Sequence, residues 1–287
     1  MKEENMSALM NIEHVDFTYS DGSRALKNVT LDIYSGEKLA VLGANGAGKS
    51  TLFLNMNGIL RPSSGKIFFK GAPVAYDKKS LIRLRKNIGI VFQDPDQQMF
   101  ASTVMGEISF GALNLGISKE ETARRVKMLA KQLGLTSLLQ KPPHFLSGGQ
   151  KKLVSIADVL IMEPEIIIFD EPMAALDPVN TDRIREILEQ LTAEGKTIVL
   201  STHDVDFAFE WADRIAVFSD GNLIQTGTPK EVFANRAVLE QGNLKMPAVL
   251  QIFQSLCAQG YFEQGMVCPS TAAALVQMIS EKKTTER

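Results

Sequence analysis

The segment with the strongest structural pattern is Gly43-Ala44-Asn45-Gly46-Ala47-Gly48-Lys49-Ser50. It fits the pattern G-x-x-x-x-G-K-[ST], follows an apolar strand candidate at 39–42 and leads into a helix expected to begin near Lys49. The glycines allow backbone N–H groups to close around phosphate oxygens, and the helix N-terminus favours negative charge. Lys49 would neutralise the β- and γ-phosphates, and the Ser50 hydroxyl suits Mg²⁺. A plain glycine-rich turn is the weaker interpretation, because both flanks match.

A second segment ends in two carboxylates. The apolar run 166–169 is followed directly by Asp170 and Glu171, as expected of a buried parallel strand whose carboxyl end meets a ligand. We expect Asp170 to hold the Mg²⁺ shell and Glu171 to orient or polarise the attacking water. The alternative is a solvated strand end with two surface acids. Together the two motifs predict a nucleoside triphosphate with Mg²⁺, which kinases, switch GTPases, helicases and transport ATPases all bind.

Composition limits the partners and the compartment. The 287 residues carry a formal net charge of −2, so no overall positive field attracts nucleic acid. Cys257 and Cys268 lie near the C-terminus and suit a reducing cytosol better than a disulfide framework. We expect no signal peptide, and no stretch approaches the roughly 20 apolar residues of a membrane span. In a transport system, the membrane path would therefore belong to other chains.

Short β-rich runs alternate with amphipathic helical segments, which predicts an α/β fold. The expected strands are 10–17, 26–33, 39–42, 66–69, 88–92, 166–169, 197–201, 214–218 and 223–225. A helical run at 179–193 joins two of them as a parallel strand–helix–strand unit requires. Helical patterns dominate from about 104 to 162, including 119–133, and predict a helical insertion. Beyond about residue 234, helical patterns at 247–259 and 270–281 predict a separate small element.

A third motif, which we call the signature segment, is Leu146-Ser147-Gly148-Gly149-Gln150. It precedes a helical run expected at 151–162, so Ser147 and the glycine N–H groups would lie at a helix N-terminus that faces an anion. A compact domain has little use for two such devices on one γ-phosphate. We infer that the second device serves a nucleotide held by another copy. A capped helix with a loose glycine loop explains these residues equally well in isolation.

Over about residues 8–235, these motifs resemble the nucleotide-binding subunit of an ATP-binding-cassette transporter. The matching positions, in order, are Tyr19, the glycine loop, Gln93, the signature segment, Asp170-Glu171, Ala174-Ala175-Leu176-Asp177 and His203. The resemblance implies a P-loop NTPase cassette (1–235) with a mixed sheet core and an N-terminal antiparallel β subdomain. It also implies a helical signature subdomain at about 94–163 and a small C-terminal extension at 236–287 through which subunits pair.

The resemblance implies a role for each matching residue. Tyr19 stacks on adenine, or is simply a tyrosine at a strand edge. Gln93 touches the Mg²⁺ and water site, and His203 holds the γ-phosphate, Glu171 and water in line. Catalytic roles thus fall to Glu171, His203 and Gln93, and Mg²⁺ to Ser50, Gln93 and Asp170. ATP contacts are implied for Tyr19, Gly43, Ala44, Asn45, Gly46, Ala47, Gly48, Lys49, Ser50, Thr51, Ser147, Gly148, Gly149, Gln150 and Asp177.

The resemblance also implies how the parts work together. Two ATP molecules lie between two cassettes, each bound by one subunit's glycine loop and the other's signature segment. Asp177 crosses this interface and couples the two sites, or caps the helix that begins at Pro178, and both roles are compatible. The partners would be a second copy or a related ATPase, with integral-membrane scaffold and substrate-binding subunits. The chain would lie on the cytoplasmic face of the cell membrane as a peripheral protein.

The residues after Gln93 indicate a subgroup. The segment 91–100 is similar to energy-coupling-factor ATPases, especially the cobalt-transport branch, whereas vitamin-uptake relatives usually carry Asn in place of Asp94 and Gln97. Leu244-Lys245-Met246-Pro247, with Leu250, is similar to the C-terminal extension of that group. We therefore expect cobalt transport, with nickel or a vitamin as alternatives. The histidines His14, His144 and His203 are scattered, so the chain itself is not expected to bind the transported ion.

The sequence departs from the family pattern at three positions, and two other classes of ATP-binding protein are alternative interpretations. Family positions that commonly hold arginine, glycine and threonine are here Leu153, Asp158 and Met173, which leaves the packing of the signature helix open and allows pairing with a different ATPase. A soluble cassette ATPase acting on ribosomes or DNA typically has two cassettes or a long coiled coil, and the balanced charge argues against nucleic acid. A small-molecule kinase would leave the signature segment and His203 without a role.

Overall fold

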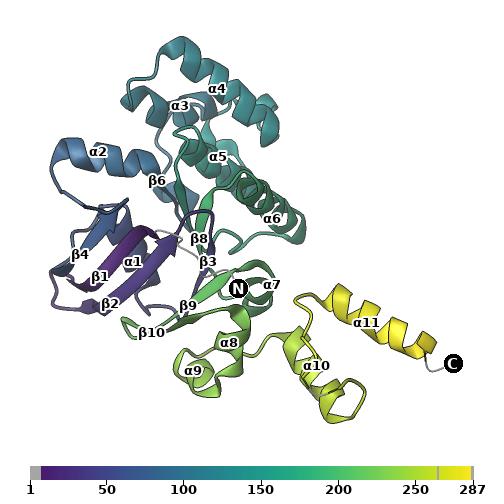
Figure 1. Ribbon diagram of the computed structural model, residues 1–287. Coiled ribbons are helices and arrows are strands. Elements are labelled where there is room, and N and C mark those ends of the chain that lie inside the picture. The colour runs from purple at the N-terminus through teal and green to yellow at the C-terminus, as the bar shows by residue number, and fades with distance from the viewer. Residues whose placement is uncertain (1–7, 264, 286–287) are drawn as a thin grey trace.

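A six-stranded mixed sheet forms the centre of the protein, whose computed structural model describes residues 8–263 and 265–285 (Figure 1). Its order is β10-β9-β3-β8-β7-β6, with β6 to β9 parallel and β10 antiparallel to β9. The strands are β3 (Lys38–Leu42), β6 (Ile88–Val91), β7 (Ile166–Asp170), β8 (Thr197–Ser201), β9 (Arg214–Ser219) and β10 (Asn222–Gly227). Every residue of β6, β7 and β8 is buried, which explains their continuous apolar sequences.

A second, antiparallel sheet flanks the first, and β3 of the central sheet comes between its strands β2 and β4 in the sequence. Its order is β2-β1-β4-β5, with β1 (Ala8–Thr18), β2 (Arg24–Tyr34), β4 (Ser64–Phe69) and β5 (Ala72–Pro73). Buried residues of β1 and β2 join residues of β3 and helix α1 in one apolar cluster, so the two sheets share a core. The expected mixed core and antiparallel N-terminal sheet are both confirmed. The two-residue strand β5 was not expected, because so short a segment carries no periodic pattern.

A helical subdomain lies between β6 and β7 in the sequence and at the top of Figure 1. It contains α3 (Val104–Asn114), α4 (Lys119–Gln132) and α5 (Gly148–Leu160), and α2 (Lys78–Asn87) precedes β6; short 3₁₀ helices occupy Pro95–Gln97, Thr136–Leu138 and Pro143–Phe145. Helix α5 begins three residues before the expected 151. The reason is a capping box, in which Ser147 Oγ accepts from the Gln150 N–H and the Gln150 side chain accepts from the Ser147 N–H. The signature glycines are therefore the first turn of the helix.

The remaining helices cover the sheet and form the C-terminal part of the chain. They are α1 (Lys49–Met56), α6 (Pro178–Ala193), α7 (Val205–Trp211), α8 (Pro229–Ala234), α9 (Arg236–Gln241), α10 (Ala248–Ala258) and α11 (Ala272–Thr285). The last two helices extend to one side of the molecule in Figure 1. Even so, Phe253 of α10 and Leu275 of α11 belong to the same apolar cluster as Leu42 of β3 and Val217 of β9. In the described part of the chain, no helix combines the length and apolar character needed to span a bilayer.

Candidate functional site

The carboxyl ends of three neighbouring parallel strands bring the predicted site residues together. Asp170 at the end of β7 pairs in register with Ser201 at the end of β8, and Ser201 pairs in turn with Val41 of β3. The glycine loop follows β3, Glu171 follows β7 and His203 follows β8. Because parallel strands end at the same edge of the sheet, segments distant in the sequence meet there.

The glycine loop (43–50) has a backbone conformation that is unfavourable for residues with a Cβ atom. Gly43 has φ +143° and Gly48 has φ +104°, both in the region that favours glycine. A Cβ atom on Gly43 would overlap the carbonyl oxygen of Phe218, and one on Gly48 would lie 2.5 Å from the carbonyl oxygen of Ala25. Helix α1 starts at the next residue, so its free N–H groups and its positive dipole end face the loop interior. The loop is therefore built to receive an anion.

Lys49 brings a buried positive charge to this loop. Its side chain is only 6% exposed, and its Nζ donates to the carbonyl oxygens of Gly43 at 2.7 Å and Ala44 at 3.1 Å. Burial lowers the pKa of Lys49, while the nearby carboxylates Glu171 and Asp170 act in the opposite direction. Among the described residues, these two carbonyl groups of its own loop accept the hydrogen bonds of the ammonium, which leaves its charge available to neutralise a phosphate group.

Hydroxyl groups on both sides fix the Asp170 carboxylate. Ser50 Oγ donates to Asp170 Oδ2 at 2.6 Å, and Ser201 Oγ donates to Asp170 Oδ1 at 2.6 Å. Ser201 Oγ also accepts from the backbone N–H of Glu171 at 2.9 Å. The predicted magnesium ligands Ser50 and Asp170 are thus adjacent, and they offer the hard oxygen atoms that Mg²⁺ prefers. Together with the glycine cradle, this donor set fits a Mg²⁺-nucleotide.

Glu171 and His203 form a pair beside this carboxylate. His203 Nε2 lies 2.9 Å from Glu171 Oε1, and the described residues provide no other hydrogen-bond partner for this buried oxygen. Burial raises the pKa of Glu171, whereas His203 and Lys49 lower it. The backbone of Glu171 has φ +45°, a left-handed conformation that is uncommon for non-glycine residues. Glu171 Oε1 is thus a buried acceptor that faces His203 at the edge of the sheet.

A cavity of about 350 Å³ opens at this edge. It is lined by Tyr19, Ser23, Arg24, Ala25, Asn45, Gly46, Ala47, Gly48, Lys49, Ser50, Thr51, Gln93, Asp170 and Glu171. The Tyr19 hydroxyl lies 2.9 Å from Thr51 Oγ1, its ring packs edge-on against Phe17, and the residue is 39% exposed. A planar base can therefore reach the ring. Gly43, Ala44 and His203 line a neighbouring cavity of about 610 Å³ that also reaches Lys245.

The signature segment and Asp177 do not line this first cavity, but they adjoin each other. A Cβ atom on Gly149 would lie 2.5 Å from the side chain of Asn180, so this glycine permits close packing of α5 against α6. Asp177 caps α6, because its Oδ1 accepts from the Asn180 N–H at 2.9 Å and its Oδ2 accepts from Asn180 Nδ2 at 2.6 Å. Asn180 therefore joins the two segments.

Sequence reasoning missed several polar residues of this region. Ser23 and Arg24 line the cavity, and Ser201, Asn180 and Lys152 contact residues of the predicted site. Lys152 of α5 is 2% exposed, and its Nζ donates to the carbonyl oxygens of Phe92 and Gln93. A serine that ends an apolar strand beside Asp170 could have been noticed from its position. The contacts of Lys152 and Asn180 depend on packing between elements far apart in the sequence, so no local pattern announces them.

The chain is similar to several known proteins. A family model described as "ABC transporter" matches residues 26–174. The energy-coupling factor transporter ATP-binding protein EcfA of Methanocaldococcus jannaschii is 50% identical over 240 residues, which cover 84% of this chain and 86% of that protein. EcfA2 of Clostridium perfringens is 45% identical over 249 residues, covering 86% of this chain and 87% of that protein.

Solved structures of ATP-binding cassettes also match this chain. The structure of cbiO1 from Clostridium perfringens, described as part of the ABC transporter complex cbiONQ, matches with a TM-score of 0.72 at 45% identity. The match covers 86% of this chain and 99% of that one. An ATP-binding cassette solved as a dimer in a post-hydrolysis state with ADP and Pi matches with a TM-score of 0.71 at 30% identity, covering 77% of this chain and 98% of that one.

Proposed function

Because this chain belongs to the ABC transporter family, as the ATP-hydrolysing subunit of an energy-coupling-factor transporter, we propose that it binds two ATP molecules at a dimer interface and drives the uptake of cobalt ions through membrane partners. The observation that best supports the ATP site is a series of contacts that runs from Ser50 through Asp170 and Ser201 to Glu171 and His203. These contacts support the proposal, because the residues expected to bind phosphate and metal and to act as the base lie together at one edge of the sheet.

The glycine loop and Lys49 bind the phosphates in this proposal. The N–H groups at the start of α1 donate to phosphate oxygens, and the Lys49 ammonium offsets the charge of the β- and γ-phosphates. Mg²⁺, held by Ser50, Gln93 and Asp170, would neutralise further phosphate charge when bound. Tyr19 offers its exposed ring to the adenine.

Glu171 acts on the water that attacks the γ-phosphorus. The water oxygen forms a bond to phosphorus, the bond from phosphorus to the β–γ bridging oxygen breaks, and Glu171 takes the proton that the water loses. Its buried carboxylate is a stronger base than an exposed one, because burial raises its pKa. His203, 2.9 Å away, orients Glu171 and reaches the γ-phosphate from the end of β8.

A second subunit completes each site. Gly148 at the start of α5 is exposed and does not line the chain's own cavity, so its helix N–H group is available to a nucleotide on another cassette. A related cassette has been solved as a dimer with ADP and Pi, which supports this arrangement. The C-terminal extension at 236–287 would add contacts between the subunits, and the partner would be a second copy or a related ATPase.

A groove beside the helical subdomain suits the membrane partner. It has a volume of about 580 Å³ and lies where β6, α2, α3 and α5 meet. Ile82, Phe92, Phe100, Phe110 and Met162 are among its apolar lining residues. A helix of an integral-membrane scaffold protein would bury these side chains and hold the chain at the cytoplasmic face of the cell membrane as a peripheral subunit.

The choice of cobalt rests on resemblance. Asp94 and Gln97, which follow Gln93, are typical of the cobalt-transport branch, and cbiO1 is among the structural neighbours. Nickel and vitamins remain the alternative solutes. A soluble cassette ATPase outside transport is the alternative of a different class.

Reconstitution in vesicles tests the proposal. The tagged chain is purified with its membrane partners, and ATP-dependent uptake of Co²⁺, Ni²⁺ and vitamins is compared with uptake by the complex that contains Glu171→Gln. We expect Co²⁺ uptake in the wild-type complex alone. Uptake of a vitamin but of neither metal would refute the cobalt assignment. Co-sedimentation with ribosomes in place of co-purification with integral-membrane proteins would refute transport altogether.

A further inference from the structure

Lys152 is a buried lysine that the mechanism above does not use. Its Nζ donates to the carbonyl oxygen of Phe92 at 2.9 Å and to that of Gln93 at 2.6 Å. Within residues 8–263 and 265–285 it forms no ion pair, and burial lowers its pKa to about 8, with Asp170 and Asp94 opposing the shift. Keeping an ammonium in such a place is costly unless its hydrogen bonds serve a purpose.

The two carbonyl groups need this donor. The pairing of β6 with β7 ends at Val91, so Phe92 and Gln93 lie beyond the sheet, at the start of a loop that we call the Gln93 loop (92–98). A carbonyl group at such a partly buried position loses free energy unless a donor replaces water. Lys152 supplies that donor to both groups at once, and it does so from α5.

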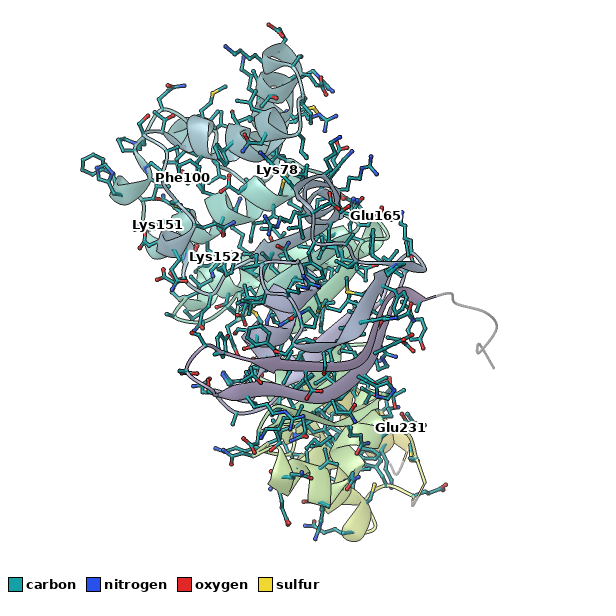
Figure 2. The ribbon with its side chains drawn as sticks, turned by 90° about the vertical axis from the view of Figure 1, so that its left-hand side faces the viewer. Lys78, Phe100, Lys151, Lys152, Glu165 and Glu231 are labelled. Carbon is teal, nitrogen blue, oxygen red and sulfur yellow. The ribbon has the colours of Figure 1, made fainter. Side chains whose placement is uncertain are left out.

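Two further contacts join α5 to the Gln93 loop. Lys151 Nζ lies 2.6 Å from Asp96 Oδ1, and Ser155 Oγ donates to Gln98 Oε1 at 2.7 Å. Figure 2 shows Lys151 nearer the edge of the molecule and Lys152 further inside. Helix α5 therefore contacts the Gln93 loop at its start, middle and end, and Lys152 makes the contact to Gln93 itself.

We propose that Lys152 is a positioning residue that holds Gln93 through its backbone and ties it to the helix that carries the signature segment. Ser147 begins that helix five residues earlier. The proposal rests on the proposed roles of Gln93 and of the signature segment. Through Lys152, the Gln93 loop of a subunit's own ATP site and the signature segment that it presents to the other subunit's ATP move together.

Hydrogen exchange tests the contact directly in the full-length chain without nucleotide. Lys152→Met removes the donor at similar volume, and we expect faster amide exchange in the Gln93 loop and unchanged exchange in the glycine loop. Lys151→Met is the matched control, because it removes the exposed Asp96 contact and leaves both carbonyl bonds. Lys152→Arg keeps a buried cationic donor and should restore most of the protection. Unchanged exchange in Lys152→Met would overturn the proposal.

Kinetics separates positioning from a purely structural role. Lys152→Met should lower kcat about tenfold or more with a Kd for ATP within about twofold of wild type, since charge-assisted hydrogen bonds stabilise Gln93 and not the glycine loop. In the Gln93→Ala background the same substitution should lower kcat less than about twofold, because the residue on which it acts is gone. Full multiplication of the two effects, or loss of ATP binding, would overturn the positioning role.

These experiments distinguish failure of the proposed ATP mechanism from failure of the proposed role of Lys152. If wild-type hydrolysis did not depend on Glu171, the ATP mechanism would be wrong, and the exchange measurement on Lys152→Met would still decide whether Lys152 holds the Gln93 loop. If Lys152→Arg folded and bound ATP but exchanged and turned over like Lys152→Met, the donor role of Lys152 would be refuted.

Discussion

At the scale of single residues, Glu171 shows how backbone and side chain cooperate. Its N–H is held by Ser201, its backbone has a positive φ, and its carboxylate faces His203 with one oxygen free of other partners among the described residues. The first two features fix the direction of the side chain, and burial raises its pKa. A base that is held in place and largely shielded from solvent can act on a bound water without first rearranging.

Replacing Glu171 with glutamine tests this role. The amide has the same shape but cannot take a proton, so we expect kcat to fall by about 10²- to 10⁴-fold while the Kd for ATP stays within about threefold. Because ATP would be bound but not hydrolysed, the closed dimer should accumulate, which gel filtration with Mg²⁺-ATP would detect. Near-normal hydrolysis by this variant would remove Glu171 from the role of base.

At the scale of elements, different residues of α5 contact different parts of the molecule. Its start carries the signature segment, Lys152 contacts the Gln93 loop, and Leu153 packs into the main apolar cluster. Met173, another departure from the family pattern, packs against the same cluster. Asp158 lines the groove of about 580 Å³ together with Glu107. The departures at Leu153 and Met173 are thus accommodated in the core, whereas Asp158 places an acidic group in a poorly hydrated position.

Asp158→Asn should change the pH dependence of stability. Burial, with a smaller contribution from Glu107, raises the pKa of Asp158 well above its usual value. The folded chain therefore binds this proton more tightly than the unfolded chain, so the stability that the residue contributes is present below the unfolded pKa and is lost as pH rises through the folded pKa. We expect the free energy of unfolding of the variant, relative to wild type, to increase from pH 4 to pH 8 in urea titrations. A difference that is constant or decreases over this range would contradict the assignment.

At the scale of the whole molecule, the C-terminal extension is joined to the cassette by a common core. Phe253 of α10 stacks on Phe262, with ring centroids 5.4 Å apart, and both belong to the apolar cluster that includes Leu42 of β3 and Val217 of β9. Strand β3 leads directly into the glycine loop. The packing of the extension and the position of the ATP site therefore depend on the same strand.

Phe253→Ala should destabilise the whole chain rather than the extension alone. Truncation of a buried phenylalanine costs about 3–5 kcal/mol of unfolding free energy, and we expect this loss in a single cooperative transition in urea. The matched control is Val276→Ala on the exposed face of α11, which should change the free energy by less than about 0.5 kcal/mol. Two separate transitions, with the cassette unaffected, would show that the extension unfolds independently.

Features that depend on local pattern can be predicted from the amino-acid sequence. The glycine loop, the strand before Asp170 and Glu171, and the capped start of α5 are contiguous segments, and their residues dictate their conformation through φ preference, apolar runs and capping. These segments were enough to predict a P-loop cassette and its main site residues. The expected start of α5 at 151 is three residues late, because the capping box of Ser147 and Gln150 begins the helix at Gly148.

Which side chains meet across the fold depends on packing between segments that are distant in the sequence. The two contacts of Ser201, the link from Gly149 through Asn180 to Asp177, and the hold of Lys152 on Gln93 join residues brought together by strand order and helix packing. The common core of α10 with β3 is of the same kind. Such contacts form because they lower the free energy of the whole packed molecule. They therefore cannot be predicted from any single segment of the sequence.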